Sequence, residues 1–145
     1  MASLGGTATL SATTLRENAA ITGGGLAVAS STAEVTGGTV ANNTASQNGG
    51  GFSATSGAEL TLTNVLVSGN DAVSGGGGMS LDAARGVLAG TTELVGNSAG
   101  NFGGAVLGQH GARFLGVDAR ITRNEATLGG GGVFNDAVSI VTLEG

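Results

Sequence analysis

The chain has 145 residues, of which 30 are glycine and 40% are hydrophobic, with a formal net charge of −5 at pH 7. Only 10% of the residues are charged, which excludes the high-charge, low-hydrophobicity balance of a disordered chain. Five arginines, no lysine and no cysteine exclude a phosphate-tracking basic surface, disulfide bonds and thiolate metal sites, so nucleic acid is not an expected partner.

The first segment, MASLGGTATLSATT, shows neither the basic region nor the apolar region of a signal peptide. No apolar run approaches the length of a membrane-spanning helix. We therefore expect no membrane insertion by this segment.

From Leu15 onward the chain repeats a unit of 25 to 27 residues. Each copy has an aliphatic residue, an asparagine three places later, an alanine two places after that, and then a glycine cluster. The asparagines are Asn18, Asn43, Asn70, Asn97 and Asn124, and the alanines are Ala20, Ala45, Ala72, Ala99 and Ala126. Five copies in one register indicate a solenoid in which each repeat forms one coil.

Each glycine cluster leads into an apolar residue that we expect to begin a strand: Leu26, Phe52, Met79, Val106 and Val133. Within the copies, pairs such as Leu60/Leu62, Val65/Val67 and Val141/Leu143 have the period of two that is typical of strands. No stripe with a 3.6-residue period is long enough for a helix. The sequence therefore predicts about three short strands per copy, in an all-β, right-handed parallel β-helix of about five coils of ~27 residues.

The repeated positions have distinct expected roles in such a coil. The alanine is expected to point inward at a tight corner, where a longer side chain would overpack the interior. The glycines are expected to form a turn that needs positive φ or a close backbone approach. The asparagines, stacked coil over coil, are expected to form a ladder of amide hydrogen bonds.

The copies resemble the repeats of chlamydial-type polymorphic outer-membrane proteins, which combine an aromatic-x-x-Asn element with a Gly-Gly-Ala-aliphatic element. The first element here reads Leu15-x-x-Asn18, Val40-x-x-Asn43, Val67-x-x-Asn70, Leu94-x-x-Asn97 and Ile121-x-x-Asn124, and the second is closest in Gly103-Gly104-Ala105-Val106. The resemblance covers nearly the whole chain. It implies a right-handed parallel β-helix outside the cell, as in autotransporter passengers, that carries adhesion or surface structure. The family's phenylalanine is aliphatic here.

We expect residues 1–145 to form a single β-helix segment of a longer chain or assembly, because the motif is established by Leu15 and no capping segment is visible. The expected function is a structural or adhesive, non-catalytic segment of an extracellular, cell-surface or filament protein. The expected partners are protein chains that cap or extend the ends, or host or matrix surface glycans. The alternative is a carbohydrate-binding or carbohydrate-acting β-helix, similar to a pectate lyase, whose active residues lie elsewhere. The absence of Trp and Tyr disfavours this alternative.

A few side chains invite a more specific interpretation. Asp71 and Glu125 follow ladder asparagines two coils apart, about 10 Å along the stack, which invites comparison with the carboxylate pair of inverting glycosidases. We interpret their column as solvent-facing. His110 is the only histidine, and we predict a solvated loop residue and no metal site or cofactor. Asn42, in Asn42-Asn43-Thr44, is the acceptor of the sole N-glycosylation sequon, which matters only in a eukaryotic secretory route.

Overall fold

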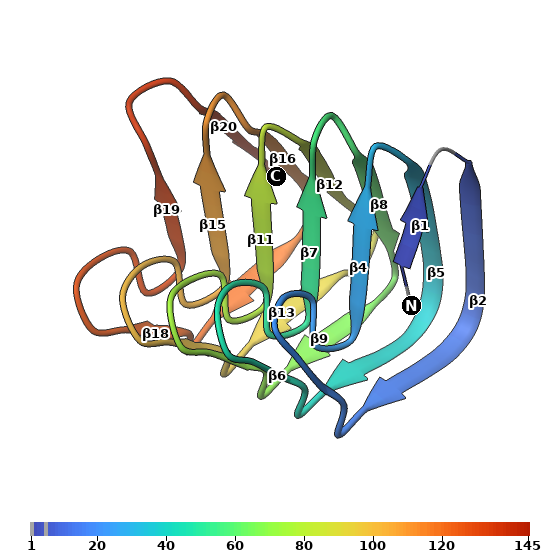
Figure 1. Ribbon diagram of the computed structural model, residues 1–145, viewed down its shortest axis with the longest axis horizontal. Coiled ribbons are helices and arrows are strands. Elements are labelled where there is room, and N and C mark those ends of the chain that lie inside the picture. Colours follow the sequence, from blue (N-terminus) through green and yellow to red (C-terminus); the bar gives the residue numbers. More distant parts are fainter. Residues whose placement is uncertain (1, 5) are drawn as a thin grey trace.

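The computed structural model describes residues 2–4 and 6–145, and within them the chain forms twenty strands and no helix. The strands make three parallel sheets that run along the stack (Figure 1). The result is the predicted parallel β-solenoid of about five coils, wound in the right-handed sense that parallel connections adopt (Figure 1). The described part of the chain has no helix with the length and hydrophobicity that a membrane crossing needs.

Sheet A contains the strand that follows each glycine cluster. In spatial order its members are β1 (Ala2–Leu4), β4 (Leu26–Ala29), β7 (Phe52–Thr55), β11 (Met79–Asp82), β15 (Val106–Gln109) and β19 (Val133–Asn135). The five predicted strand starts are confirmed. They also stand beside one another, with Phe52 next to Met79 and Met79 next to Val106.

Sheet B follows sheet A and bends around a corner. The first two coils cross this corner with one long strand each, β2 (Thr7–Arg16) and β5 (Thr32–Ala41). The later coils divide it into β8 (Glu59–Thr63) and β9 (Leu66–Ser68), β12 (Arg85–Ala89) and β13 (Glu93–Val95), and β16 (Arg113–Val117) and β17 (Arg120–Thr122), with β20 (Ile140–Glu144) last. The bend uses left-handed backbone, at φ 57° for Asn64 and 62° for Gly90.

Sheet C is made of two-residue strands at the predicted corner: β3 (Ala19–Ala20), β6 (Thr44–Ala45), β10 (Asp71–Ala72), β14 (Ser98–Ala99) and β18 (Glu125–Ala126). A central coil therefore holds four strands, where the sequence predicted about three. The additional strand is missed because two residues are too few to show a period of two.

The core lies inside the coils and is filled by aliphatic side chains with little aromatic contribution. Neighbouring coils use residues of different size at one inward position, with Leu60, Gly86 and Phe114 in register. The glycine leaves no cavity, because a Cβ there would lie 2.8 Å from Cδ1 of Leu81. The interior volume is thus conserved by compensation within a coil rather than by identical residues.

Candidate functional site

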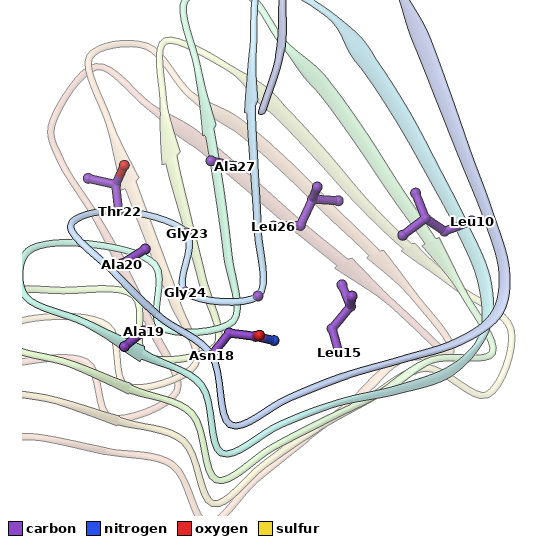
Figure 2. A pocket seen from close by; sticks show the side chains of 11 residues that line it. Leu10, Leu15, Asn18, Ala19, Ala20, Thr22, Gly23, Gly24, Leu26 and Ala27 are labelled. Atoms are coloured by element: carbon purple, nitrogen blue, oxygen red, sulfur yellow. The ribbon is translucent and has the colours of Figure 1, made fainter. Parts of the chain in front are cut away.

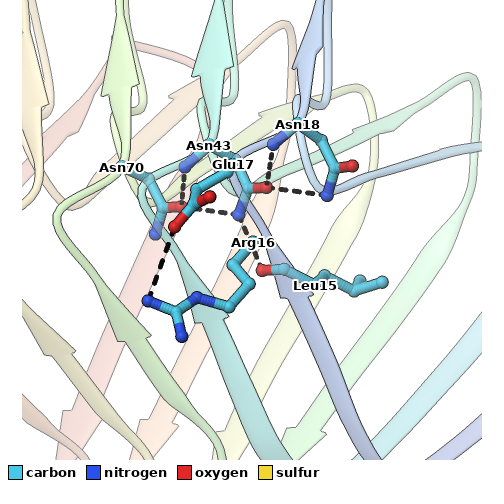
Figure 3. A network of polar contacts seen from close by, with 6 residues as sticks. All are labelled: Leu15, Arg16, Glu17, Asn18, Asn43 and Asn70. Carbon is cyan, nitrogen blue, oxygen red and sulfur yellow. Dashed lines mark hydrogen bonds and ion pairs between the residues drawn. The ribbon is translucent and has the colours of Figure 1, made fainter.

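The five asparagines of the repeat lie in one column and are hydrogen-bonded in series. Figure 3 shows the first three, Asn18, Asn43 and Asn70. In each step, the backbone N–H and the side-chain Nδ2 of one asparagine both donate to Oδ1 of the asparagine in the next coil. These eight donor–acceptor distances are between 2.9 and 3.1 Å. The ladder therefore has a direction, with acceptors facing the amino-terminal coil.

The second Nδ2 hydrogen of each later asparagine explains the spacing of the motif. Asn43 donates to the carbonyl of Leu15 at 3.0 Å, and Asn70 donates to the carbonyl of Val40 at 2.9 Å. The acceptor in each case belongs to the aliphatic residue of the preceding copy, three places before its asparagine (Figure 3). The aliphatic side chain packs in the core while the backbone carbonyl of the same residue accepts a hydrogen bond from the ladder. The aliphatic residue and the asparagine of the motif therefore stabilise the same corner of the coil.

Burial divides the ladder into a protected centre and two open ends. Asn43, Asn70 and Asn97 are at most 1% exposed. Asn18 is exposed and Asn124 is half-buried. Because a buried amide without partners is costly, the central asparagines carry most of the stabilisation that the ladder provides.

The alanine column lies beside the ladder in sheet C and follows the same pattern. Ala45, Ala72 and Ala99 are buried, whereas Ala20 is exposed and Ala126 is half-buried in the first and last coils. The inward position predicted for the alanines holds in the central coils, where neighbours cover them on both sides.

The glycine turns combine both requirements expected from the sequence. The glycine three places before each strand start has positive φ, as for Gly76 at 65°, and it counts as the first position of the turn. The second approaches the next coil closely, since a Cβ on Gly77 would lie 2.1 Å from the carbonyl oxygen of Ser98 and 2.5 Å from that of Gly104. The third position holds the fully buried Ala105 in the fourth turn, whereas a Cβ on Gly78 would lie 2.7 Å from the carbonyl oxygen of Ala105.

Apolar side chains also meet on the face of sheet A that points away from the core. The sequence did not predict this contact. The glycine loop folds back over the sheet, and the rings of Phe102 and Phe134 meet with centroids 4.4 Å apart. Gly75 opposes Leu107 in the same layer, where a Cβ would lie 2.5 Å from Cδ2. The sequence did contain a signal for it. The register position that holds Ser53 and Ser80 in earlier coils holds the large apolar residues Leu107 and Phe134 in later ones.

The carboxylates Asp71 and Glu125 are both exposed, and the structure places Ser98 between them in register. The Ser98 hydroxyl donates to Oδ1 of Asp71. The two carboxylates remain two strand spacings apart, about 10 Å along the stack, and line a shallow groove of about 400 Å³. The arrangement is that of an open polar column.

His110 is exposed, as predicted for a loop residue, but it is held by two aspartates from neighbouring coils. Its Nδ1 lies 2.6 Å from Oδ1 of Asp82, and its backbone N–H donates to Oδ2 of Asp136 at 2.7 Å. The hydrogen bond with Asp82 and the charge of that carboxylate raise the pKa of His110. Hydrogen bonds from Ser139 and from the backbone of His110 lower the pKa of Asp136.

The electrostatic contact of His110 thus spans three coils, which the prediction of a merely solvated residue did not anticipate. Within residues 6–145, no group of three or more His, Asp or Glu side chains is arranged to hold a metal ion.

The sequon residue Asn42 is exposed and has left-handed backbone, with φ 54°. It occupies the corner just before the ladder, where its neighbour Asn43 is fully buried. A glycan on Asn42 would therefore point away from the ladder, and its use as an acceptor stays a prediction.

The coils at the two ends of the described stack each border an open pocket. The first, of about 490 Å³, is lined by Leu10, Leu15 and Leu26 together with Asn18 (Figure 2). The second, of about 520 Å³, includes Leu143 in its wall. Both pockets are the continuation of the solenoid interior rather than clefts in its side.

No family model, no curated protein and no solved structure significantly matches this chain. The β-solenoid is established by the geometry above.

Proposed function

We propose that the chain is a non-catalytic structural and adhesive segment of a protein outside the cell, at the cell surface or in a filament. The observation that carries the proposal is the contrast between the interior and the exterior of each coil. One column of sheet C is alanine in all five coils and is buried in the three central ones, whereas the adjacent outward column reads Ala19, Thr44, Asp71, Ser98 and Glu125.

This contrast is what we expect of a binding surface, in which outward residues vary between coils while inward residues that hold the coils together stay the same. Each coil is joined to the next through three sheets and the asparagine ladder, so the stability of the stack comes from nearest-neighbour contacts. Substitutions at outward positions away from these contacts cost little stability. An exterior of this kind can diversify toward partners while the rod keeps its shape.

The motif supports the same proposal. The aliphatic-x-x-Asn and Gly-Gly-Ala-aliphatic elements resemble those of polymorphic outer-membrane proteins, and both lie at the corner that builds the ladder. We therefore propose that the chain is a protein of that surface type. Its proposed partners are protein chains that cap or extend the solenoid ends, and glycans of a host or matrix surface.

The test of location and role uses the chain in its source cells. Antibodies raised against the purified chain should label intact cells as strongly as permeabilised ones, and beads coated with the chain should adhere to a glycan-bearing surface. Labelling that requires permeabilisation would contradict the proposed location. Release of reducing ends from a polysaccharide by the pure chain would contradict the non-catalytic role and favour the carbohydrate-acting alternative.

A further inference from the structure

Two arginines on neighbouring coils lie side by side on the outer face of sheet B. Arg85 begins β12, Arg113 begins β16, and the two are register partners. Their backbones are therefore one strand spacing apart, about 4.8 Å. On the other side of Arg85 stands Glu59, whose Oε1 lies 3.8 Å from the arginine Nη1.

The column thus carries one carboxylate for two guanidinium groups. Arg113 forms no ion pair within residues 6–145, and it is exposed. Like charges on directly opposed strand positions are destabilising. An anion between the two guanidinium groups would remove that cost, and guanidinium groups present planar sets of N–H donors that match a carboxylate.

The arginines border a groove with a mixed surface. The groove has a volume of about 510 Å³ and is lined by Glu59, Arg85, Arg113, Phe114, Leu115, Ile140 and Thr142. This volume lies in the range of about 300–1,000 Å³ that small-molecule sites occupy. Leu115 and Ile140 offer apolar surface to the C–H face of a ring, while Thr142 and Glu59 offer oxygen atoms to hydroxyl groups.

We propose that this groove binds the carboxylate of an acidic saccharide, a uronate, between Arg85 and Arg113. The inference rests on the proposed adhesive function and gives it a ligand class. Glu59 closes the column on one side, so the site accommodates one anionic group rather than an extended polyanion. The net charge of −5 also disfavours binding of an extended polyanion, because the protein as a whole repels it.

Binding is tested by NMR titration of the full chain, labelled with ¹⁵N, at constant ionic strength. Sodium glucuronate should shift the amide signals of Arg113 and Thr142 in a saturable manner, and glucose should not shift them. Sodium sulfate should bind more weakly than glucuronate, because it offers no ring to the apolar wall. Equal binding of glucose, or sulfate binding as tight as that of glucuronate, would overturn the uronate assignment.

The matched variants are Arg113→Gln and Arg123→Gln. Arg123 is also exposed and has no ion pair within residues 6–145, so its variant makes the same charge change away from the groove. The first variant should weaken glucuronate binding by at least about ten-fold, as expected for a lost charge-assisted hydrogen bond, and the second should leave it unchanged. Equal weakening by both would refute the site.

A conservative variant keeps the test decisive. Arg113→Lys retains the charge but not the planar donor pair, and should weaken binding several-fold. Cell labelling does not depend on this groove, and neither does adhesion of beads to a surface whose glycans lack uronate, so both can succeed while the titration fails. Failure of the titration therefore rejects the uronate site alone.

Discussion

Replacement of Asn70 by alanine is the most direct test of the ladder. The side-chain Oδ1 accepts the backbone N–H of Asn43 at 3.0 Å and its Nδ2 at 2.9 Å. The side-chain Nδ2 donates at 2.9 Å both to the carbonyl of Val40 and to Oδ1 of Asn97. Alanine removes all four hydrogen bonds, and the site is 1% exposed, so bulk water does not replace them.

The expected loss follows from the groups that the substitution leaves without a partner. The Asn43 N–H loses its acceptor, the Asn70 Oδ1, and the Val40 carbonyl loses its donor, the Asn70 Nδ2. A buried polar group left unsatisfied costs about 1–3 kcal/mol, so the free energy of unfolding should fall by about 2–6 kcal/mol. For a chain of this size, about 2–4 °C of melting temperature corresponds to each kcal/mol, which predicts a drop of at least about 4 °C.

The matched control is Asn48→Ala. Asn48 is half-buried in the glycine loop, and its side chain makes no hydrogen bond within residues 6–145. Thermal and urea denaturation, followed by circular dichroism, should show a loss of less than about 1 kcal/mol for this variant. Equal destabilisation by the two substitutions would refute the assignment of stability to the ladder.

Three further outcomes are expected. Asn18→Ala, at the exposed end of the ladder, should cost less than about 1 kcal/mol in urea denaturation, and a loss as large as at a buried asparagine would contradict the burial argument. Gly77→Ala should destabilise more than Gly78→Ala. A Cβ on Gly77 would lie 2.1 Å and 2.5 Å from two backbone carbonyl oxygens of the next coil, whereas a Cβ on Gly78 would lie 2.7 Å from one; equal melting temperatures would count against this difference in close approach. The raised pKa of His110 means that its contact with Asp82 stabilises the fold fully below the unfolded pKa near 6.5, and that this contribution is lost as the pH rises through the folded value. NMR titration of the His110 ring should show a lower pKa in Asp82→Asn, and an unchanged pKa would reject the pairing.

The ladder shows how much of the fold is readable from the chain. The asparagine, the aliphatic residue three places before it and the alanine two places after it recur together, so stacking coils in register brings equivalent residues into contact. The hydrogen bonds from Nδ2 to Oδ1 and to the preceding aliphatic carbonyl then follow from the geometry of one corner.

Contacts between outward side chains were harder to predict from the sequence, because turn lengths differ between coils. Arg85 and Arg113 are 28 residues apart, although the asparagines around them repeat every 27. The turn before Arg113 has one residue more than the turn before Arg85, and Gly111 with φ 80° accommodates it. The contact between Asp82 and His110 is diagonal, because the register partner of Asp82 is Gln109.

The sequence by itself determined the repeat, the parallel coil and the ladder, because inward positions are constrained by packing and by the need to satisfy buried polar groups. Only the tertiary structure decided which outward side chains become neighbours. Outward residues carry no periodic constraint, and a one-residue change in a turn reassigns every contact along the following strand. The pair Arg85 and Arg113 exists because of such a change.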